Sequence, residues 1–395
     1  MTDGHPSPEG VPPPPPSGEE PVRSVYIHAP FCARRCFYCD FAVTVDRAPD
    51  PVPWLHSIEA ELRLLEEDGW VAGAPLDTLY VGGGTPSLLG TEAMAGLARI
   101  LGPHRLESPG LEWTVEANPE SVTPELAAGW RRAGVNRVSL GVQSFQEPVL
   151  RWMGRLHGAA GAVGAVDTLR KAGFENISVD LIFGLPAHLG RSWREDLERV
   201  QALELPHVSL YGLTAEEGTP LYRAVGTGRE TLADPDRYRE EYLEAAERLG
   251  SAGYLHYEVS NLCRPGMEAR HNAVYWSGDP WMGLGNSAHA FRSPVRRWNL
   301  RDWAEYRGAV LSGQLPVADS EVIGPEEARL ERIWLGLRTS RGLPRSSLSG
   351  AERAVARRWE EEGWTLADPE FLRLSAEGWL LLDRLAVELD GVAIS

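Results

Sequence analysis

Apolar runs rich in β-branched residues recur along the first half of the chain and alternate with amphipathic stretches. The apolar runs, which we expect to be strands, cover residues 25–28, 78–81, 112–116, 137–142, 177–183 and 208–213. The amphipathic stretches between them, which we expect to be helices, cover residues 54–67, 92–101, 124–133, 162–172 and 193–203. Strands that recur at roughly thirty residues and are almost continuously apolar predict parallel βαβ units, with both faces of the sheet covered.

The pattern predicts an α/β fold with an incomplete, three-quarter parallel β/α barrel, because a full barrel needs about eight strands. We expect residues 23–300 to form this barrel. A further helix at 236–249 and a strand-like run at 254–259 precede a segment rich in Trp, Gly and His at 270–291, which has little regular periodicity. Residues 1–22 are rich in Pro, Gly and Glu and are expected to form a disordered tail.

The pattern changes to short helices towards the C-terminus. We expect a linker at residues 301–319 and a small helical, winged-helix-like domain at 320–395. Winged helices often bind DNA, but residues 320–395 carry 14 acidic and 10 basic side chains, a net charge of −4, and no basic recognition stripe. A structural or protein-contact role is therefore the favoured interpretation.

The composition limits the partners and the compartment. A net charge of −17 over 395 residues argues against broad binding to nucleic acid, whose phosphates require a basic face. No apolar run is long enough to span a membrane and no signal peptide is recognisable, so we expect a cytoplasmic protein without a stable membrane span. In a reducing compartment a tight group of cysteines indicates a metal site more than a disulfide.

Three of the four cysteines, Cys32, Cys36 and Cys39, lie on one short loop in the spacing C-x3-C-x2-C. Three thiolates on one loop suit three corners of an iron–sulfur cluster, which leaves one iron open to another ligand. The alternative is a zinc site completed by His28, although four ligands from so short a stretch would be cramped. Arg34 and Arg35 inside the loop either favour the thiolate form or are surface charges.

Polar residues also interrupt or follow the other apolar runs. They are a glycine run at 82–84 with Thr85, then Glu116, Gln143 and Asp180, and Arg155 lies close by in the sequence. A buried polar group must be paired inside the protein or bound to a polar ligand, so internal salt bridges and helix caps are the alternative to a site. In parallel α/β folds the carboxyl ends of the strands form the active face, so we expect these residues to meet there.

The cysteine spacing after a first strand resembles the radical S-adenosylmethionine (SAM) superfamily, whose members hold a 4Fe-4S cluster through three cysteines and bind SAM on the open iron. The downstream residues resemble its coproporphyrinogen-dehydrogenase-like branch. The resemblance implies Cys32, Cys36 and Cys39 as cluster ligands. It implies SAM contacts at Tyr26, Tyr38, Gly83, Gly84, Thr85, Glu116, Gln143, Arg155 and Asp180.

The branch contains oxygen-independent coproporphyrinogen III oxidases of porphyrin biosynthesis and a family of haem chaperones. The oxidases resemble C-x3-C-x2-C-x-C, whereas Phe41 stands here where the fourth cysteine would be, as in the haem chaperones. The run His271-Asn-Ala-Val-Tyr-Trp resembles a signature of the chaperone family. It implies that residues 254–291 bind haem or substrate, with His271 as the haem ligand and His289 as second choice. Cys263 is expected to be a buried structural thiol or a haem contact.

The resemblance therefore implies a protein that binds haem, a 4Fe-4S cluster and SAM and passes haem to acceptors, among them membrane respiratory proteins. The oxidase is the alternative. A SAM-dependent modifier of tRNA or peptides is a third class, and the acidic composition counts against the tRNA version.

Overall fold

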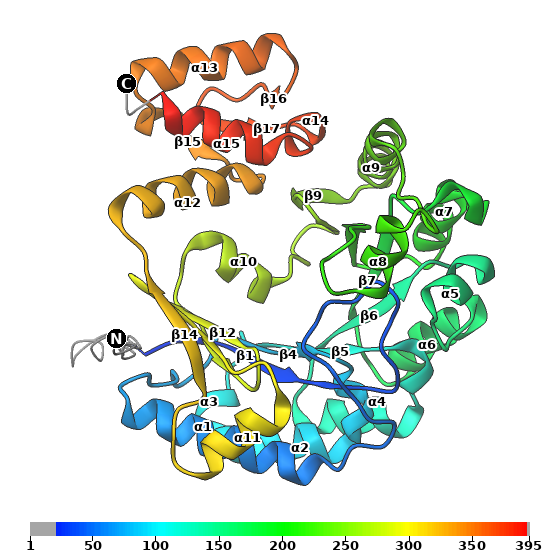
Figure 1. Ribbon diagram of the computed structural model, residues 1–395, viewed down its shortest axis with the longest axis vertical. Helices are drawn as coiled ribbons and strands as arrows, with labels where there is room; N and C mark the ends of the chain where they lie inside the picture. The colour runs from blue at the N-terminus through cyan, green and yellow to red at the C-terminus, as the bar shows by residue number, and fades with distance from the viewer. Residues whose placement is uncertain (1–20, 393–395) are drawn as a thin grey trace, which may run out of the picture.

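A curved nine-stranded sheet organises the computed structural model, which describes residues 21–392 (Figure 1). The strand order is β11-β1-β4-β5-β6-β7-β8-β10-β9. The strands from β1 to β8 in this order run parallel: β1 (Ser24–Ala29), β4 (Thr78–Gly83), β5 (Glu112–Ala117), β6 (Arg137–Gln143), β7 (Asn176–Phe183) and β8 (His207–Gly212). The predicted incomplete parallel barrel is thus confirmed.

The two edges of this parallel sheet are extended by short strands from later in the chain. Strand β11 (Met282–Leu284) pairs parallel with β1, while β10 (Asn261–Cys263) pairs antiparallel with β8 and with β9 (Leu255–Glu258). The strand-like run expected at 254–259 is therefore an edge strand. Because β9 and β11 are not neighbours in the sheet, the barrel stays open on one side.

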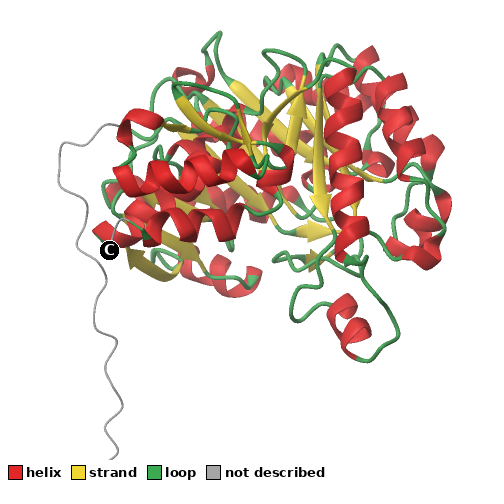
Figure 2. Cartoon of the chain, turned by 90° about the horizontal axis from the view of Figure 1, so that it is seen from above, coloured by secondary structure: helices red, strands yellow, loops and turns green. Residues whose placement is uncertain are grey.

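Helices cover the outer side of the sheet (Figure 1), and the view from above shows them packed round the strands (Figure 2). They are α1 (Pro51–Glu67), α2 (Gly90–Leu101), α4 (Pro124–Ala133), α6 (Ala159–Lys171), α7 (Trp193–Ala202) and α9 (Pro235–Ser251). Their apolar sides meet fully buried strand residues such as Val81, Val115 and Leu140. Burial of each such side chain contributes about 1.5–3 kcal/mol, which holds the strand ends in register.

Side-chain caps define where these helices begin. Asp50 accepts a hydrogen bond from the backbone N–H of Val52 at the start of α1, and Thr123 accepts one from Leu126 at the start of α4. Such caps satisfy N–H groups that have no partner inside the helix. Shorter elements complete the barrel: β2 (Phe31–Cys32), β3 (Thr44–Val45), α3 (Pro103–Leu106), α5 (Glu147–Met153) and α8 (Pro220–Gly226).

The segment at 270–291 is more regular than its sequence pattern predicts. It contains α10 (Arg270–Ser277), β11 and the start of β12 (His289–Arg292), and these elements are too short to produce a clear periodicity. Strand β12 forms a small antiparallel sheet with β13 (Val295–Asn299) and β14 (Val317–Val322). The expected linker at 301–319 contains α11 (Trp303–Leu311), whose Tyr306 is fully buried against α1.

A small C-terminal unit follows, with helices α12 (Pro325–Arg338), α13 (Gly350–Glu361), α14 (Ala376–Trp379) and α15 (Leu382–Gly391). Its strands β15 (Leu343–Pro344), β17 (Phe371–Leu374) and β16 (Thr365–Leu366) form a three-stranded sheet. Its buried residues join the same hydrophobic cluster as the barrel core. The guanidinium of Arg338 lies over Trp276 of α10, 4.1 Å from the ring centre, so this unit also rests on α10.

Most of the Pro-rich tail predicted at 1–22 lies outside the described residues. Val22, its last residue, is fully buried and pairs with Ala72 in a parallel bridge, so the ordered barrel begins before residue 23. Within residues 21–392 no helix is both long enough and apolar enough to cross a membrane.

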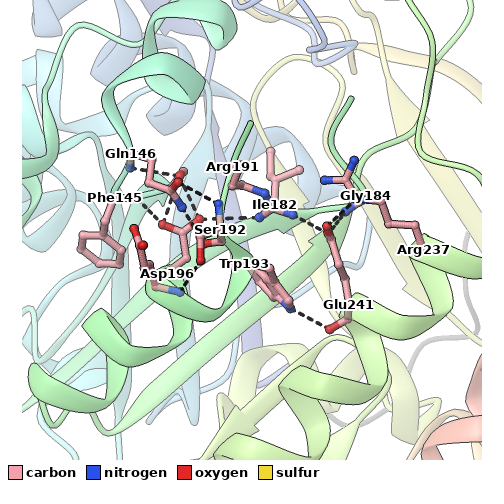
Figure 3. A network of polar contacts seen from close by, with 12 residues as sticks. Phe145, Gln146, Ile182, Gly184, Arg191, Ser192, Trp193, Asp196, Arg237 and Glu241 are labelled. Carbon is pink, nitrogen blue, oxygen red and sulfur yellow. Dashed lines mark hydrogen bonds and ion pairs between the residues drawn. The ribbon is translucent and has the colours of Figure 1, made fainter. Parts of the chain in front are cut away.

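A buried network of charges holds the loops that follow β6 and β7 (Figure 3). Arg191 forms ion pairs with Glu241 of α9 and with Asp196 of α7, and it donates to the carbonyl of Ile182 in β7. The Arg191 side chain has no exposed surface, so its charge depends on these partners. The end of β7 is thereby tied to two outer helices.

The carboxylates of this network also accept backbone hydrogen bonds. Asp196 accepts one from Phe145 at 2.8 Å, and Glu241 accepts one from Gly184 at 2.7 Å. Phe145 and Gly184 lie just beyond the ends of β6 and β7. The network therefore fixes both loops by their backbone.

We predict that Arg191→Met lowers the free energy of unfolding by about 3–5 kcal/mol, because the buried Asp196 loses its cation and Glu241 keeps only Arg237. Chemical denaturation followed by circular dichroism measures this change. Arg194→Met removes an exposed arginine that pairs with Glu244, and it should cost at most about 1 kcal/mol. Equal effects of the two substitutions would contradict the role given to the buried network.

Candidate functional site

The loop that carries the cysteines begins directly after β1. Its base is closed by the short parallel pair β2–β3, with hydrogen bonds from Thr44 N to Pro30 O at 2.7 Å and from Asp46 N to Cys32 O at 2.9 Å. The cysteine loop thus leaves the end of β1, and its two ends are joined by the β2–β3 pair. Cys32, Cys36 and Cys39 are each partly exposed, and all three are free thiols.

The glycine run at the end of β4 is paired with the chain that leads into this loop. Gly84 N donates to Ala29 O at 2.8 Å, and Thr85 N donates to Phe31 O at 2.7 Å. A Cβ on Gly84 would lie 2.7 Å from the Phe31 carbonyl oxygen, so only glycine fits this close approach. The Thr85 hydroxyl consequently lies 3.4 Å from the Cys32 sulfur.

A cavity of about 420 Å³ opens where the cysteine loop faces the carboxyl ends of the strands. Its volume lies within the range of about 300–1,000 Å³ typical of small-molecule sites. Eleven of the thirteen residues predicted for the site line it: Cys32, Cys36, Tyr38, Cys39, Gly83, Gly84, Thr85, Glu116, Gln143, Arg155 and Asp180. The polar residues predicted at the strand ends therefore lie round one cavity, as expected.

Glu116 lies at the end of β5, beside the glycine run. Its carboxylate accepts a hydrogen bond from Tyr80 Oη at 2.7 Å and one from Gly83 N at 2.9 Å. Burial, together with the neighbouring Asp180, raises the pKa of this carboxyl to about 7. Burial also raises the pKa of Asp180, which accepts from Ser139 Oγ at 3.2 Å. Two acidic groups thus face a cavity in which a cation would stabilise their ionised forms.

Sequence reasoning missed Asn118, which joins the two sides of the cysteine loop. Its amide donates to Thr85 Oγ1 at 3.1 Å and accepts from Arg155 Nη2 at 2.5 Å. Arg155 in turn approaches Cys36 Sγ at 3.8 Å. A polar chain therefore runs from Cys32 through Thr85, Asn118 and Arg155 to Cys36. The sequence signal for Asn118 is its position two residues after Glu116, just beyond the end of a strand.

Gln143 has a backbone conformation that indicates a constrained position. Its φ is +70°, which is uncommon for a residue other than glycine, and the pairing of β6 with β7 shifts register here. Its side-chain amide lines the cavity and makes no hydrogen bond to another residue within 21–392. An amide aimed into a cavity without a partner suits a polar ligand.

The three thiols suit an iron–sulfur cluster better than a site for one metal ion. Burial raises the pKa of Cys32 to about 11 and also raises the pKa of Cys39, so these thiols are neutral until a metal displaces their protons. Within residues 21–392 no three His, Cys, Asp or Glu side chains surround one point closely enough to hold a single ion. A cluster places each thiolate on a different iron, which this separation allows.

His28, the predicted fourth ligand of the zinc alternative, is engaged elsewhere. Its Nε2 lies 3.0 Å from Ala42 O and its Nδ1 lies 3.1 Å from Tyr26 Oη. Burial lowers its pKa to about 4, so the ring is neutral. It lines a second cavity on the far side of Gly83 and Glu116 rather than the cavity of the cysteines. Cys263, on the edge strand β10, lines neither cavity.

Tyr26 and His271 are the two predicted site residues that do not line the main cavity. Tyr26 lines the second cavity, and its ring stacks on Tyr80 at 6.0 Å between centres. His271 is buried in α10, with Nδ1 2.7 Å from Thr78 Oγ1 and Nε2 2.9 Å from Tyr275 Oη. Both of its ring nitrogens are therefore occupied. Haem ligation by His271 stays a prediction.

The family comparisons agree with this geometry. The Radical SAM superfamily matches residues 26–200. A haem chaperone HemW of Mycobacterium tuberculosis is 38% identical over 375 residues, covering 93% of this chain and 94% of the relative. HemW of Bacillus subtilis is 31% identical and covers 91% of this chain and 97% of the relative. The chain belongs to the HemW family of radical SAM proteins.

A solved structure supports the fold of this HemW family member. The coproporphyrinogen III oxidase HemN of Escherichia coli, a radical SAM enzyme, superposes with a TM-score of 0.77. The match covers 94% of this chain and 90% of the oxidase, at 20% sequence identity. At that identity the likeness concerns the fold alone. The family match and the HemW relatives, by contrast, confirm the predicted superfamily and branch.

We predict that Glu116→Gln changes how stability depends on pH. A carboxyl whose pKa rises from 4.5 to about 7 on folding takes up a proton, so it stabilises the fold below pH 4.5 and loses this contribution as pH rises through 7. On protein free of cluster and SAM, the unfolding free energy of the wild type should fall by roughly 1–3 kcal/mol relative to the variant between pH 5 and pH 8.

Urea denaturation at both pH values measures this difference. Glu125→Gln, which replaces an exposed carboxyl in the first turn of α4, is the matched control. A difference between wild type and Glu116→Gln that stays constant across the range would contradict the raised pKa.

Proposed function

We propose that this protein is a haem chaperone that carries a 4Fe-4S cluster and SAM in the main cavity and delivers haem to acceptor proteins. The observation that carries the proposal is the likeness to curated HemW proteins over more than nine tenths of the chain, together with eleven predicted site residues round one cavity. Both relatives bear the name haem chaperone HemW.

The residues of the main cavity fit a cluster and SAM. We assign Cys32, Cys36 and Cys39 as the three thiolate ligands, since they are the free thiols that line the cavity. The guanidinium of Arg155 lies 3.8 Å from Cys36 Sγ, where it would offset negative charge on a bound cluster. When bound, the cluster supplies a reducing electron and an open iron for the amino and carboxylate groups of SAM.

The remaining cavity residues orient a polar, cationic ligand. Gly83 has a φ of +107°, and its N–H is held by Glu116, so the backbone at the end of β4 presents a fixed edge. Glu116 and Asp180 supply negative charge where an amino or sulfonium group would lie. Gln143 supplies an amide without a hydrogen-bond partner among residues 21–392, and Tyr38 and Leu156 supply apolar surface. Such a mixture of polar and apolar groups suits an adenosyl compound.

We predict that each of Cys32→Ala, Cys36→Ala and Cys39→Ala abolishes binding of about four irons per chain, because a cluster needs all three thiolates. Iron and sulfide analysis after anaerobic reconstitution measures this loss. Cys263→Ala, which replaces the one remaining cysteine, should bind iron as the wild type does. Retention of the full iron content in any of the first three variants would refute the ligand assignment.

The chaperone function itself is tested by two assays on the reconstituted protein. We expect about one haem bound per chain, and transfer of this haem to an apo form of a haem protein in the same solution. We expect no conversion of coproporphyrinogen III under anaerobic, reducing conditions, because Phe41 lies in both cavities where the oxidase pattern has a cysteine. Steady conversion would identify an oxidase instead.

A further inference from the structure

The second cavity, of about 400 Å³, lies beside the main cavity and shares Asp40, Phe41, Gly83 and Glu116 with it. We call it the aromatic cavity. Its other lining residues are Tyr26, His28, Ala42, Tyr275, Trp281, Ser287, His289 and Arg301. It is therefore built from the cysteine loop, the first strand, α10 and the segment round β12. It borders the proposed cluster and SAM site at Gly83 and Glu116.

Flat apolar side chains form one wall of this cavity. Tyr275 and Trp281 meet edge to face with ring centres 4.9 Å apart, and Trp281 packs on Phe291 at 5.2 Å. The indole N–H of Trp281 donates to His289 O at 3.1 Å, so the wall is fixed in orientation. A rigid aromatic wall favours a flat, apolar ligand such as a macrocycle.

His289 is the histidine of this cavity whose ring is free to bind a metal. Neither of its ring nitrogens makes a hydrogen bond to another residue within 21–392, whereas both nitrogens of His28 and of His271 are engaged. The ring stacks on Trp298 with centres 5.6 Å apart and planes 23° apart, which restrains its orientation. His289 is an exposed residue, and partial desolvation together with the nearby Arg296 lowers its pKa, so the ring is neutral near pH 7 and can donate a lone pair.

The cavity also holds a cation suited to a carboxylate. Arg301 lines it and donates to the backbone carbonyl of Asp40, which places its guanidinium at the edge of the cysteine loop. Haem needs three features: a flat apolar wall, an imidazole for its iron and a cation for a propionate. The aromatic cavity brings all three together.

We propose that haem binds in the aromatic cavity with His289 as the axial ligand, and that His271 instead holds Thr78 and Tyr275 in place. This inference rests on the proposed haem-chaperone function. It places the haem next to Gly83 and Glu116, which also line the cluster and SAM cavity. Haem and SAM would then lie in two adjacent cavities that are separated by Gly83 and Glu116.

Titration of the full chain with haem, followed by the Soret band, tests this assignment. His289→Ala should weaken haem binding by about tenfold or more and change the Soret band, because the iron loses its axial nitrogen. Added imidazole should restore the wild-type spectrum in this variant, which loss of folding would not allow. His56→Ala, which removes an exposed histidine of α1, is the matched control and should bind haem as the wild type does.

His271→Gln tests the competing ligand, because glutamine keeps an amide for Thr78 and Tyr275. It should keep the wild-type Soret band. Wild-type binding by His289→Ala, or loss of the band in His271→Gln with restoration by imidazole, would overturn the assignment of His289. Failure of the wild type to bind haem at all would instead overturn the proposed function, so the two failures are distinguishable. SAM binding by reconstituted His289→Ala verifies that the neighbouring site is intact.

Discussion

Two backbone hydrogen bonds between the end of β4 and the chain that enters the cysteine loop hold the functional site together. They join Gly84 to Ala29 and Thr85 to Phe31, and they require a residue without a side chain at position 84. They exist because β1 and β4 are parallel neighbours whose carboxyl ends reach the same edge of the sheet. The position of Cys32 beside Thr85 follows from this pairing.

The rest of the site extends from that pairing in two directions. On one side the chain of Thr85, Asn118 and Arg155 reaches Cys36. On the other side Glu116 accepts hydrogen bonds from Gly83 N and from the hydroxyl of Tyr80. The ring of Tyr80 stacks on the ring of His271, with centres 5.2 Å apart. Helix α10 thereby connects the cavity edge to the C-terminal unit, which rests on it through Arg338 and Trp276. Helix α10, which carries the run that begins at His271, therefore links the cavity to the C-terminal unit.

The fold and the main cavity were predictable because long apolar strands and isolated polar residues leave strong signals. Glu116, Gln143 and Asp180 each stand out in or beside apolar runs, and parallel topology brings them together. Asn118 was missed because asparagine before proline is also a common turn residue. Helix α11 lies where the sequence predicts a linker, because its buried side is narrow, with Tyr306 and Val310 as its buried residues.

The haem ligand shows the limit of sequence reasoning most clearly. A motif can identify a histidine, but only the packing shows that Thr78 and Tyr275 occupy both nitrogens of His271. In the same packing the ring of His289 stacks on Trp298, and its nitrogens make no hydrogen bond to another residue within 21–392. Hydrogen-bond partners that lie almost two hundred residues away, as Thr78 does from His271, carry no local sequence signal.

The central claim, that the three cysteines hold a cluster whose open iron faces the cavity at the strand ends, is tested most directly by electron–nuclear double resonance. The sample is reconstituted, reduced wild-type protein with SAM labelled by ¹⁵N at the amino group and ¹⁷O at the carboxylate. We expect hyperfine coupling of both labels to the cluster, since both groups would bind the open iron. A reduced cluster with no coupling to either label at saturating SAM would contradict the account.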